Sequence, residues 1–240
     1  MKLHKLHLKK DFNIKNLCLC IGNFDGIHRG HQFVIKKIIE NSKKFKLKSA
    51  IMTFDPHPKI FFKKNDGDFN IITSYYKKKL LSYLGIENYI EYNFNKTLSN
   101  LEAHEFIEKV LVKQLDVKKI IVGNDFRFGK NRVGDTKLLK KLSSKYGYKF
   151  TSISHIKNKN TKQKISSSII RENIHKGDFK KVTQALGRNW QMHGKVIKGN
   201  QRARLINFPT ANIRPGNQIT PKKGVYCVNV LYYGKKLNGI

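Results

Sequence analysis

Acidic residues are scarce in this sequence: 16 Asp and Glu stand against 49 Lys and Arg in 240 residues, a formal net charge of +33. Cysteine is also scarce: the chain has three, which offer no disulfide framework. This cysteine usage favours a reducing cytoplasm. No apolar run reaches the ~18 residues of a membrane span, and the basic, interrupted opening MKLHKLHLKK lacks the apolar stretch of a signal peptide. The sequence therefore predicts a soluble, cytoplasmic protein with no membrane partner.

A charge of this size favours binding to the phosphate backbone of nucleic acids. The lysines are nevertheless spread through every segment, and Lys, Asn, Ile, Phe and Tyr are abundant together, as in an AT-biased coding sequence. A nucleic-acid binding patch should instead gather on one face of the protein. We therefore expect small molecules, and not nucleic acid, to be the main partners.

Short apolar runs alternate with amphipathic segments through the first part of the chain. Strands are predicted at 17–21, 49–54, 88–94, 118–123 and 148–154, and helices after the turn at 22–31 and over 74–85, 99–115 and 135–147. Ser99 and Glu102 have the spacing of a capping box at the start of the 99–115 helix. This alternation predicts an α/β fold: a Rossmann-like parallel sheet with helices on both faces.

The pattern changes near the end of the chain. Two short helices are predicted in 165–187, and short strands and turns without helical periodicity follow from Trp190 onward. We therefore predict a domain boundary near Gly187 to Trp190, with an α/β domain over 1–187 and a smaller β-rich domain over 188–240.

The segment GNFDGIHRGH (22–31) joins a buried strand to a helix and is the first candidate site. Its glycines (Gly22, Gly26 and Gly30) allow backbone amides at a helix N-terminus to approach a phosphate closely. His28 and His31 lie at the mouth of the helix, where two imidazoles could stabilise charge on a phosphate during transfer. The segment matches neither a P-loop nor a dinucleotide fingerprint. Structural histidines or a metal pair are the alternatives.

GNFDGIHRGH resembles the H-x-G-H signature of the nucleotidyltransferase superfamily. The NFDG portion is similar to the FMN adenylyltransferase module of bifunctional riboflavin kinase/FAD synthetases. The resemblance implies that His28 and His31 are catalytic and that ATP binds at Gly22, Phe24, Asp25, Gly26 and Gly30. H-x-G-H alone does not decide among the members of the superfamily, so the later motifs must discriminate.

Three later motifs also resemble this family, in the same order along the chain. TFDPHP (53–58) is similar to the T-F-x-P-x-P segment and implies a pocket for the flavin phosphate. GNDFRFG (123–129) is similar to G-x-D-F-x-F-G and implies flavin or ribose contacts, with core packing as the alternative for either phenylalanine. ISSSIIRE (165–172) resembles I-S-S-T-x-I-R, with Ser168 in place of threonine, and implies contacts to the ATP phosphates. The residues implied for flavin are Asp55, Pro56, His57, Pro58, Asp125, Phe126 and Phe128, and those for ATP phosphates are Ser167, Ser168 and the catalytic Arg171.

The C-terminal segment HGKVIKGNQRARLINFPTANI (193–213) is similar to the start of a riboflavin kinase barrel. The resemblance implies that Thr210 and Asn212 hold magnesium and the ATP phosphates. Ala203 and Asn207 replace two glycines of the family pattern, which predicts a distorted phosphate loop. The chain also ends at Ile240, before the glutamate that activates the riboflavin hydroxyl in the family, so we expect a truncated, partial β-barrel in which kinase activity is in doubt.

Together these motifs predict a FAD synthetase that transfers AMP from MgATP to FMN, releasing pyrophosphate and FAD. ATP and Mg²⁺ are the expected cofactors, FMN and riboflavin the substrates, and FAD the product. Two alternatives stay open: adenylylation of another small phosphate ester, and a basic RNA-binding protein on the same fold.

Overall fold

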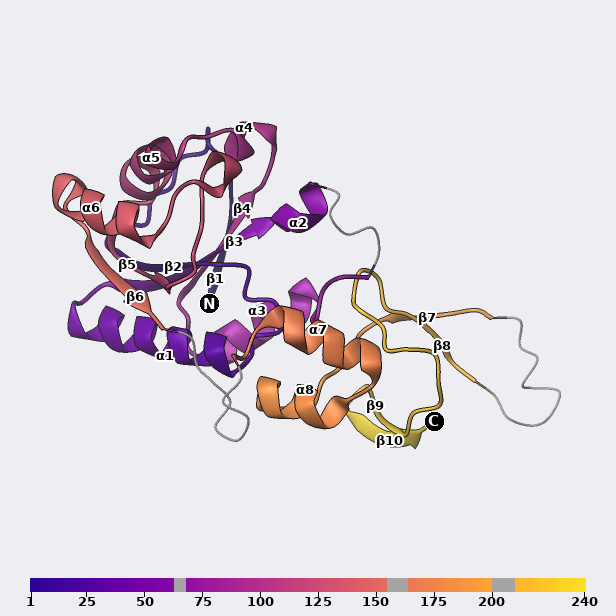
Figure 1. Cartoon of the computed structure of the whole chain (residues 1–240). Coiled ribbons are helices and arrows are strands. Elements are labelled where there is room, and N and C mark those ends of the chain that lie inside the picture. The colour runs from indigo at the N-terminus through magenta and orange to yellow at the C-terminus, as the bar shows by residue number, and fades with distance from the viewer. Residues whose placement is uncertain (63–67, 155–163, 200–209) are drawn as a thin grey trace.

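A parallel sheet forms the centre of the molecule. The computed structural model describes residues 1–62, 68–154, 164–199 and 210–240 (Figure 1). Six strands lie in the order β1-β4-β3-β2-β5-β6, and every neighbouring pair is parallel. The predicted α/β fold class is confirmed. The strands are β1 (Lys2–Leu6), β2 (Leu17–Ile21), β3 (Lys48–Asp55), β4 (Asn88–Asn93), β5 (Val117–Gly123) and β6 (Lys149–Ile153).

Helices cover both faces of this sheet, as the alternation of elements predicts (Figure 1). Side chains in β2 alternate between two apolar clusters: Leu17, Leu19 and Ile21 contribute to one, and Cys18 and Cys20 to the other. The cysteine side packs against α1 (Arg29–Lys44), α3 (Ser74–Tyr83), α7 (Ser167–Lys176) and α8 (Phe179–Leu186). The leucine side packs against α5 (Ala103–Glu105), the π-helix η1 (Phe106–Gln114) and α6 (Thr136–Tyr146).

The prediction that one helix spans 99–115 is wrong about where the helix starts. Ser99 belongs to the separate short helix α4 (Lys96–Ser99), and its hydroxyl donates to the Lys96 carbonyl. The capping box lies three residues later, because the backbone amide of Glu102 donates to the Glu105 carboxylate at 3.1 Å. The remainder, Phe106–Gln114, is wound as a π-helix.

The C-terminal part contains two antiparallel strand pairs, β7 (Lys195–Ile197) with β8 (Asn212–Arg214) and β9 (Val228–Tyr232) with β10 (Lys235–Gly239). These pairs are consistent with the expected β-rich, barrel-like fold of this part. Two other short elements, α2 (Pro58–Phe61) and the 3₁₀ turn η2 (Lys130–Arg132), lie in loops of the first part. Across the described ranges, no helix combines the length and the apolar character that crossing a membrane requires.

Candidate active site

The predicted site motifs follow β2, β3 and β5, three neighbouring strands of one parallel sheet. The carboxyl ends of parallel strands meet at the same edge, so the segments after Ile21, Asp55 and Gly123 share that edge. The start of α7, which carries the fourth motif, reaches the same place, because the Ser167 hydroxyl donates to the Asp25 carbonyl at 2.9 Å. Tertiary structure thus gathers motifs from a span of about 150 residues into one site.

His28 and His31 form a stacked pair at the N-terminus of α1. Their ring centroids are 3.6 Å apart, with an interplanar angle of 17°. His28 is the N-cap of α1, and its Nδ1 accepts the His31 backbone N–H at 3.3 Å. Because Nδ1 acts as an acceptor, a neutral His28 carries its proton on Nε2. The N-cap geometry therefore orients one imidazole, and stacking orients the other.

The surroundings of His31 keep its imidazole neutral. Burial lowers its pKa well below the ordinary value, and electrostatic interactions with His28 and with the charge of Lys77 act in the same direction. Its Nδ1 is buried and makes no hydrogen bond to any residue that the structure describes. The ring of Phe24, which is itself buried, lies with its centroid 5.0 Å from that of His31. His31 is thus available as a neutral hydrogen-bond donor or acceptor.

Asp25 holds the turn to the rest of the site from inside the protein. The residue is 3% exposed, and its carboxylate accepts the backbone N–H groups of Ile71 and Ile72. It also forms an ion pair with Arg171 Nη2 at 2.6 Å. The carboxylate that the sequence assigns to ATP binding is therefore engaged with protein groups, so its expected effect on ATP is indirect.

Arg171 occupies the junction of three segments. Its Nε donates to the Phe69 carbonyl at 2.9 Å, and its Cζ lies 3.7 Å from the centroid of the Phe69 ring. The same Phe69 ring also contacts the ring of His57 edge to face, with the two ring centroids 5.0 Å apart. The structure therefore brings the predicted Arg171, His57 and Asp25 together around Phe69, a residue that the motifs did not single out.

The DPHP segment turns from β3 into α2. Asp55 and Pro56 are exposed at the end of the strand, and Pro58 is the first residue of α2. His57 caps this helix, because its Nδ1 accepts the Lys59 N–H at 3.0 Å. Burial, and then the charges of Arg171, Lys77 and Lys59, lowers the pKa of His57 to about 3. His57 is therefore a neutral ring at neutral pH.

The two serines predicted to bind phosphate occupy different positions. Ser166 is the N-cap of α7, and its side chain accepts the Ile169 N–H at 3.4 Å. Ser167 donates its hydroxyl to Asp25, as described above, whereas Ser168 is exposed in the first turn of α7. Ser168 is thus the serine of this pair whose side chain faces solvent at a helix N-terminus.

The NDFRF motif separates into a core residue and two accessible ones. Phe128 is 6% exposed and belongs to the leucine-side core, which is the packing alternative. Phe126 is half-buried and stacks on it, with centroids 5.5 Å apart. Asp125 is exposed and pairs with Lys164 at 3.0 Å, which joins this motif to the start of α7. Phe126 therefore offers the accessible aromatic face of the motif.

Lys77 is a candidate site residue that sequence reasoning missed. This partly buried lysine of α3 donates to the Asn23 carbonyl at 3.0 Å, in the H-x-G-H turn. Burial lowers its pKa, while the charges of Asp25, Glu91 and Asp55 act in the opposite direction. It lies within a run of three lysines in the sequence, so no local signal distinguishes it from its neighbours Lys78 and Lys79.

Two glycines of the turn are required by local geometry. Gly26 has φ +85°, and a Cβ atom there would lie 3.2 Å from two carbons of Ile71. A Cβ atom at Gly30 would lie 3.0 Å from Nδ1 of His28. Gly22 is less constrained, since its nearest neighbour would be the Phe24 ring at 3.3 Å. Gly26 and Gly30 thus permit the close packing of the turn beneath the histidine pair.

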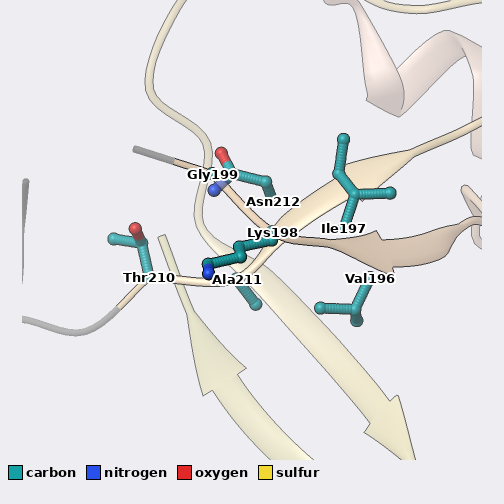
Figure 2. Close-up of a pocket in the computed structure, with 7 residues that line it drawn as sticks. All are labelled: Val196, Ile197, Lys198, Gly199, Thr210, Ala211 and Asn212. Atoms are coloured by element: carbon teal, nitrogen blue, oxygen red, sulfur yellow. The ribbon is translucent and has the colours of Figure 1, made fainter. Parts of the chain in front are cut away.

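Thr210 and Asn212 lie elsewhere: Asn212 begins β8 and Thr210 lies two residues before it, at the β7–β8 pair that Figure 1 shows away from the six-stranded sheet. Both line a hollow of about 260 Å³ that also includes Lys198 and Gly199. Figure 2 shows its lining residues, which come from β7 and from the segment that enters β8. A Cβ atom at Gly199 would overlap the Asn212 carboxamide, so the two segments approach closely. Ala203 and Asn207 fall outside the described residues.

The side chains are compatible with magnesium that is carried by a nucleotide. Among the described residues, no group of three His, Cys, Asp or Glu side chains could hold a metal ion. Mg²⁺ is usually bound through few protein oxygens together with substrate phosphates and water. The hydroxyl of Thr210 and the carboxamide oxygen of Asn212 are donors of this kind, beside the cation of Lys198.

Comparisons with known proteins match both parts of the chain. A family described as FAD synthetase matches residues 11–169, and one described as riboflavin kinase matches residues 186–240. The chain is 37% identical to a bifunctional riboflavin kinase/FMN adenylyltransferase of Buchnera aphidicola (from Acyrthosiphon pisum), over 96% of this chain and 73% of that protein. The protein of the same name from Escherichia coli K12 is 35% identical, over 91% and 69%.

A solved structure shows the same fold. The crystal structure titled a macrolide-efflux protein from Streptococcus pneumoniae superposes with a TM-score of 0.85 at 28% sequence identity. The match covers 98% of this chain and 77% of that one.

Proposed function

Since the chain belongs to the family of bifunctional riboflavin kinase/FMN adenylyltransferases, we propose that adenylyl transfer from ATP to FMN takes place beside His28 and His31. The expected FAD synthetase and riboflavin kinase resemblance is confirmed by both family matches. The substrates of the family are ATP with FMN or riboflavin, and FAD is the product. The observation that carries the assignment of the site is the stacked histidine pair at the N-terminus of α1, in which burial keeps His31 neutral.

In the proposed reaction, a phosphate oxygen of FMN attacks the α-phosphorus of ATP in line. One P–O bond forms, and the bond to the bridging oxygen of pyrophosphate breaks, with its electron pair leaving on pyrophosphate. Negative charge builds on the oxygens of the transferring phosphate and on the leaving group. The site must therefore present hydrogen-bond donors and positive charge at two places.

The histidine pair supplies donors at the transferring phosphate. The proton of a neutral His28 lies on Nε2, and the ring stands at the N-terminus of α1, where the helix dipole favours negative charge. Two imidazolium rings 3.6 Å apart would repel each other, which agrees with the low pKa of His31. We assign stabilisation of the developing charge to both rings as hydrogen-bond donors.

Lys77 and the start of α7 are suited to the leaving pyrophosphate. Lys77 lies against the turn, and Ser168 is exposed in the first turn of α7. Arg171 contributes through its charge, with two of its nitrogens committed to Phe69 and Asp25. A magnesium ion that arrives with ATP would neutralise part of the phosphate charge.

The flavin is assigned to the side of the site that carries Phe126. Its half-buried ring offers a flat surface next to Asp125, and the DPHP segment lies at the end of β3 on the same sheet edge. Asp55, Pro56, His57 and Pro58 are proposed to contact the flavin phosphate. Phe128 is proposed to act only by supporting Phe126.

The assignment is tested with the purified chain, MgATP and FMN, with FAD and pyrophosphate measured by chromatography. His31→Gln should lower kcat by about 10² to 10³, the usual effect of losing one transition-state donor. His104→Gln, a change at an exposed histidine of α5, is the matched control and should leave kcat unchanged. Equal rates for His31→Gln and wild type, with FAD still formed, would show that the chemistry lies elsewhere. RNA binding without ATP turnover would favour the alternative class.

We also propose riboflavin phosphorylation at the β7–β8 hollow, which the riboflavin kinase match includes. Thr210 and Asn212 would hold magnesium with the ATP phosphates, and Lys198 would offset their charge. The same chromatographic assay with riboflavin and MgATP measures FMN. FMN formation that Thr210→Val abolishes, while FAD formation from FMN persists, would support this separate site. Absence of FMN from wild type would contradict it.

A further inference from the structure

The turn that carries the histidine pair has an unfavourable backbone. Phe24 and Ile27 have φ of 48° and 40°, and Gly26 has φ of 85°, so three of four consecutive residues lie in the left-handed region. This region is disfavoured for residues with side chains. Such a conformation persists only where surrounding groups hold it. The hydrogen-bond partners of the turn's carbonyls are therefore decisive for the position of His28.

Arg188 provides those partners from far away in the sequence. Its Nη2 donates to the Gly26 carbonyl at 2.5 Å, and its Nη1 donates to the Ile27 carbonyl at 3.1 Å. Gln32 of α1 donates to the same Ile27 carbonyl at 2.9 Å. The two carbonyls belong to consecutive residues that directly precede His28, so the guanidinium fork fits both at once.

Arg188 is itself held in one place. It follows Gly187, the left-handed C-cap of α8, and its Nη1 also donates to the Leu186 carbonyl at 3.3 Å. Gln32 Nε2 donates to that carbonyl too, at 2.8 Å, which ties α1 to the end of α8. The Nε of Arg188 is buried and makes no hydrogen bond to the residues that the structure describes, and burial lowers the pKa of the Arg188 guanidinium. The side chain is thus fitted to the turn and is not a solvated surface cation.

A second connection joins the same two parts of the chain. The Ile71 amide donates to the Asp25 carboxylate, and the Ile71 carbonyl accepts from Trp190 Nε1 at 2.8 Å and Gln218 Nε2 at 3.0 Å. Gln218 is 1% exposed. The backbone of one residue, Ile71, therefore connects Asp25 of the histidine turn with residues of the C-terminal segment. Trp190 and Gln218, like Arg188, fall in the range that the riboflavin kinase family matches.

From these contacts we infer that Arg188, a residue of the kinase-matched segment, is a positioning residue for adenylyl transfer. It fixes the Gly26–Ile27 carbonyls and so sets the direction of His28 at the mouth of α1. The inference rests on the proposed function of the histidine pair. It adds that the FAD-forming site is completed by residues beyond its own matched family range, which ends at residue 169.

The primary test compares Arg188→Ala with Arg214→Ala, an exposed arginine of the same segment, in the full chain. Misplacement of a catalytic group by about 1 Å costs on the order of 100-fold in rate. We expect Arg188→Ala to lower kcat for FAD formation by about 10- to 100-fold with a smaller change in KM for ATP, and Arg214→Ala to match wild type. Millimolar guanidinium should restore part of the lost kcat, whereas equal urea or NaCl should not.

Two further measurements keep the inference decidable. Arg188→Gln keeps a hydrogen-bond donor without the fork or the charge and should lie between Arg188→Ala and wild type. Amide exchange of residues 24–32 should accelerate in Arg188→Ala while β2 and β3 stay protected. Unchanged kcat, a loss of kcat that guanidinium does not rescue, or unchanged exchange in the turn would overturn the inference. If wild type forms no FAD, the proposed function fails, and the exchange experiment still decides whether Arg188 holds the turn.

Discussion

Replacing Asp25 with asparagine tests whether this carboxylate is a structural anchor of the site. The wild-type carboxylate accepts two backbone N–H groups and pairs with Arg171 at 2.6 Å, and both side chains are largely buried, at 3% and 14% exposure. Removing one partner of a buried pair costs about 3 to 5 kcal/mol, because the other charge stays desolvated. In a chain of this size each kcal/mol lowers Tm by about 2 to 4 °C, so we expect a fall of about 6 to 20 °C.

Urea unfolding and thermal melting measure this loss of free energy directly. The matched control is Glu172→Gln on α7, the helix that also carries Arg171. Glu172 and Lys176 form an exposed i,i+4 ion pair there. No measurable change is expected there. The double variant Asp25→Asn/Arg171→Met should recover part of the loss, because it no longer buries an unpaired charge. If Asp25→Asn is no less stable than Glu172→Gln, the Asp25 carboxylate is not a structural anchor of the turn, and the claim that it holds the site together is wrong.

Two other predictions concern an acid-sensitive histidine and the paired phenylalanines. His57 has a folded-state pKa of about 3, below its ordinary 6.5, so the unfolded state binds more protons and stability falls as pH drops from about 6.5. His57→Gln should therefore lose less unfolding free energy than wild type between about pH 7 and pH 5 in urea titrations, and an equal loss would refute the assignment. Phe128→Ala should cost about 3 to 5 kcal/mol of stability as a core truncation. Phe126→Ala should instead raise KM for FMN about tenfold through lost ring stacking, and a reversed pattern in the two variants would contradict the proposed flavin side.

Strong local patterns made much of the sheet predictable. The run LCLCI is continuous, apolar and bounded by Gly22, and it forms β2 with the expected bounds. The helix predicted over 135–147 begins at the Asp135 cap and ends at Gly147 with φ +70°, because both signals are local. Such elements are specified by neighbouring residues, so the rest of the fold is not needed to locate them.

Other elements could not be read from neighbouring residues. β1 lies at the edge of the sheet, and three of its five residues are exposed, so its sequence carries no buried apolar run. Around residue 100, Ser99 with Glu102 and Glu102 with Glu105 have the same spacing, and packing of Ala103 and Phe106 in the core selects the later start. Equal local signals leave the choice to long-range packing.

By itself, the sequence determined the fold class, the order of the motifs and the family resemblance that they carry. Those follow from periodicity, from turn residues and from histidines at a helix mouth, which are properties of short segments. Only tertiary structure decided that Asp25 pairs with Arg171, that Phe128 is core while Phe126 is accessible, and that Lys77 and Arg188 meet the turn. Arg171 lies 146 residues from Asp25, and Arg188 lies 161 and 162 residues from Ile27 and Gly26 along the chain. Contacts at such separations exist only after the sheet has brought its strand ends together, so no local pattern encodes them.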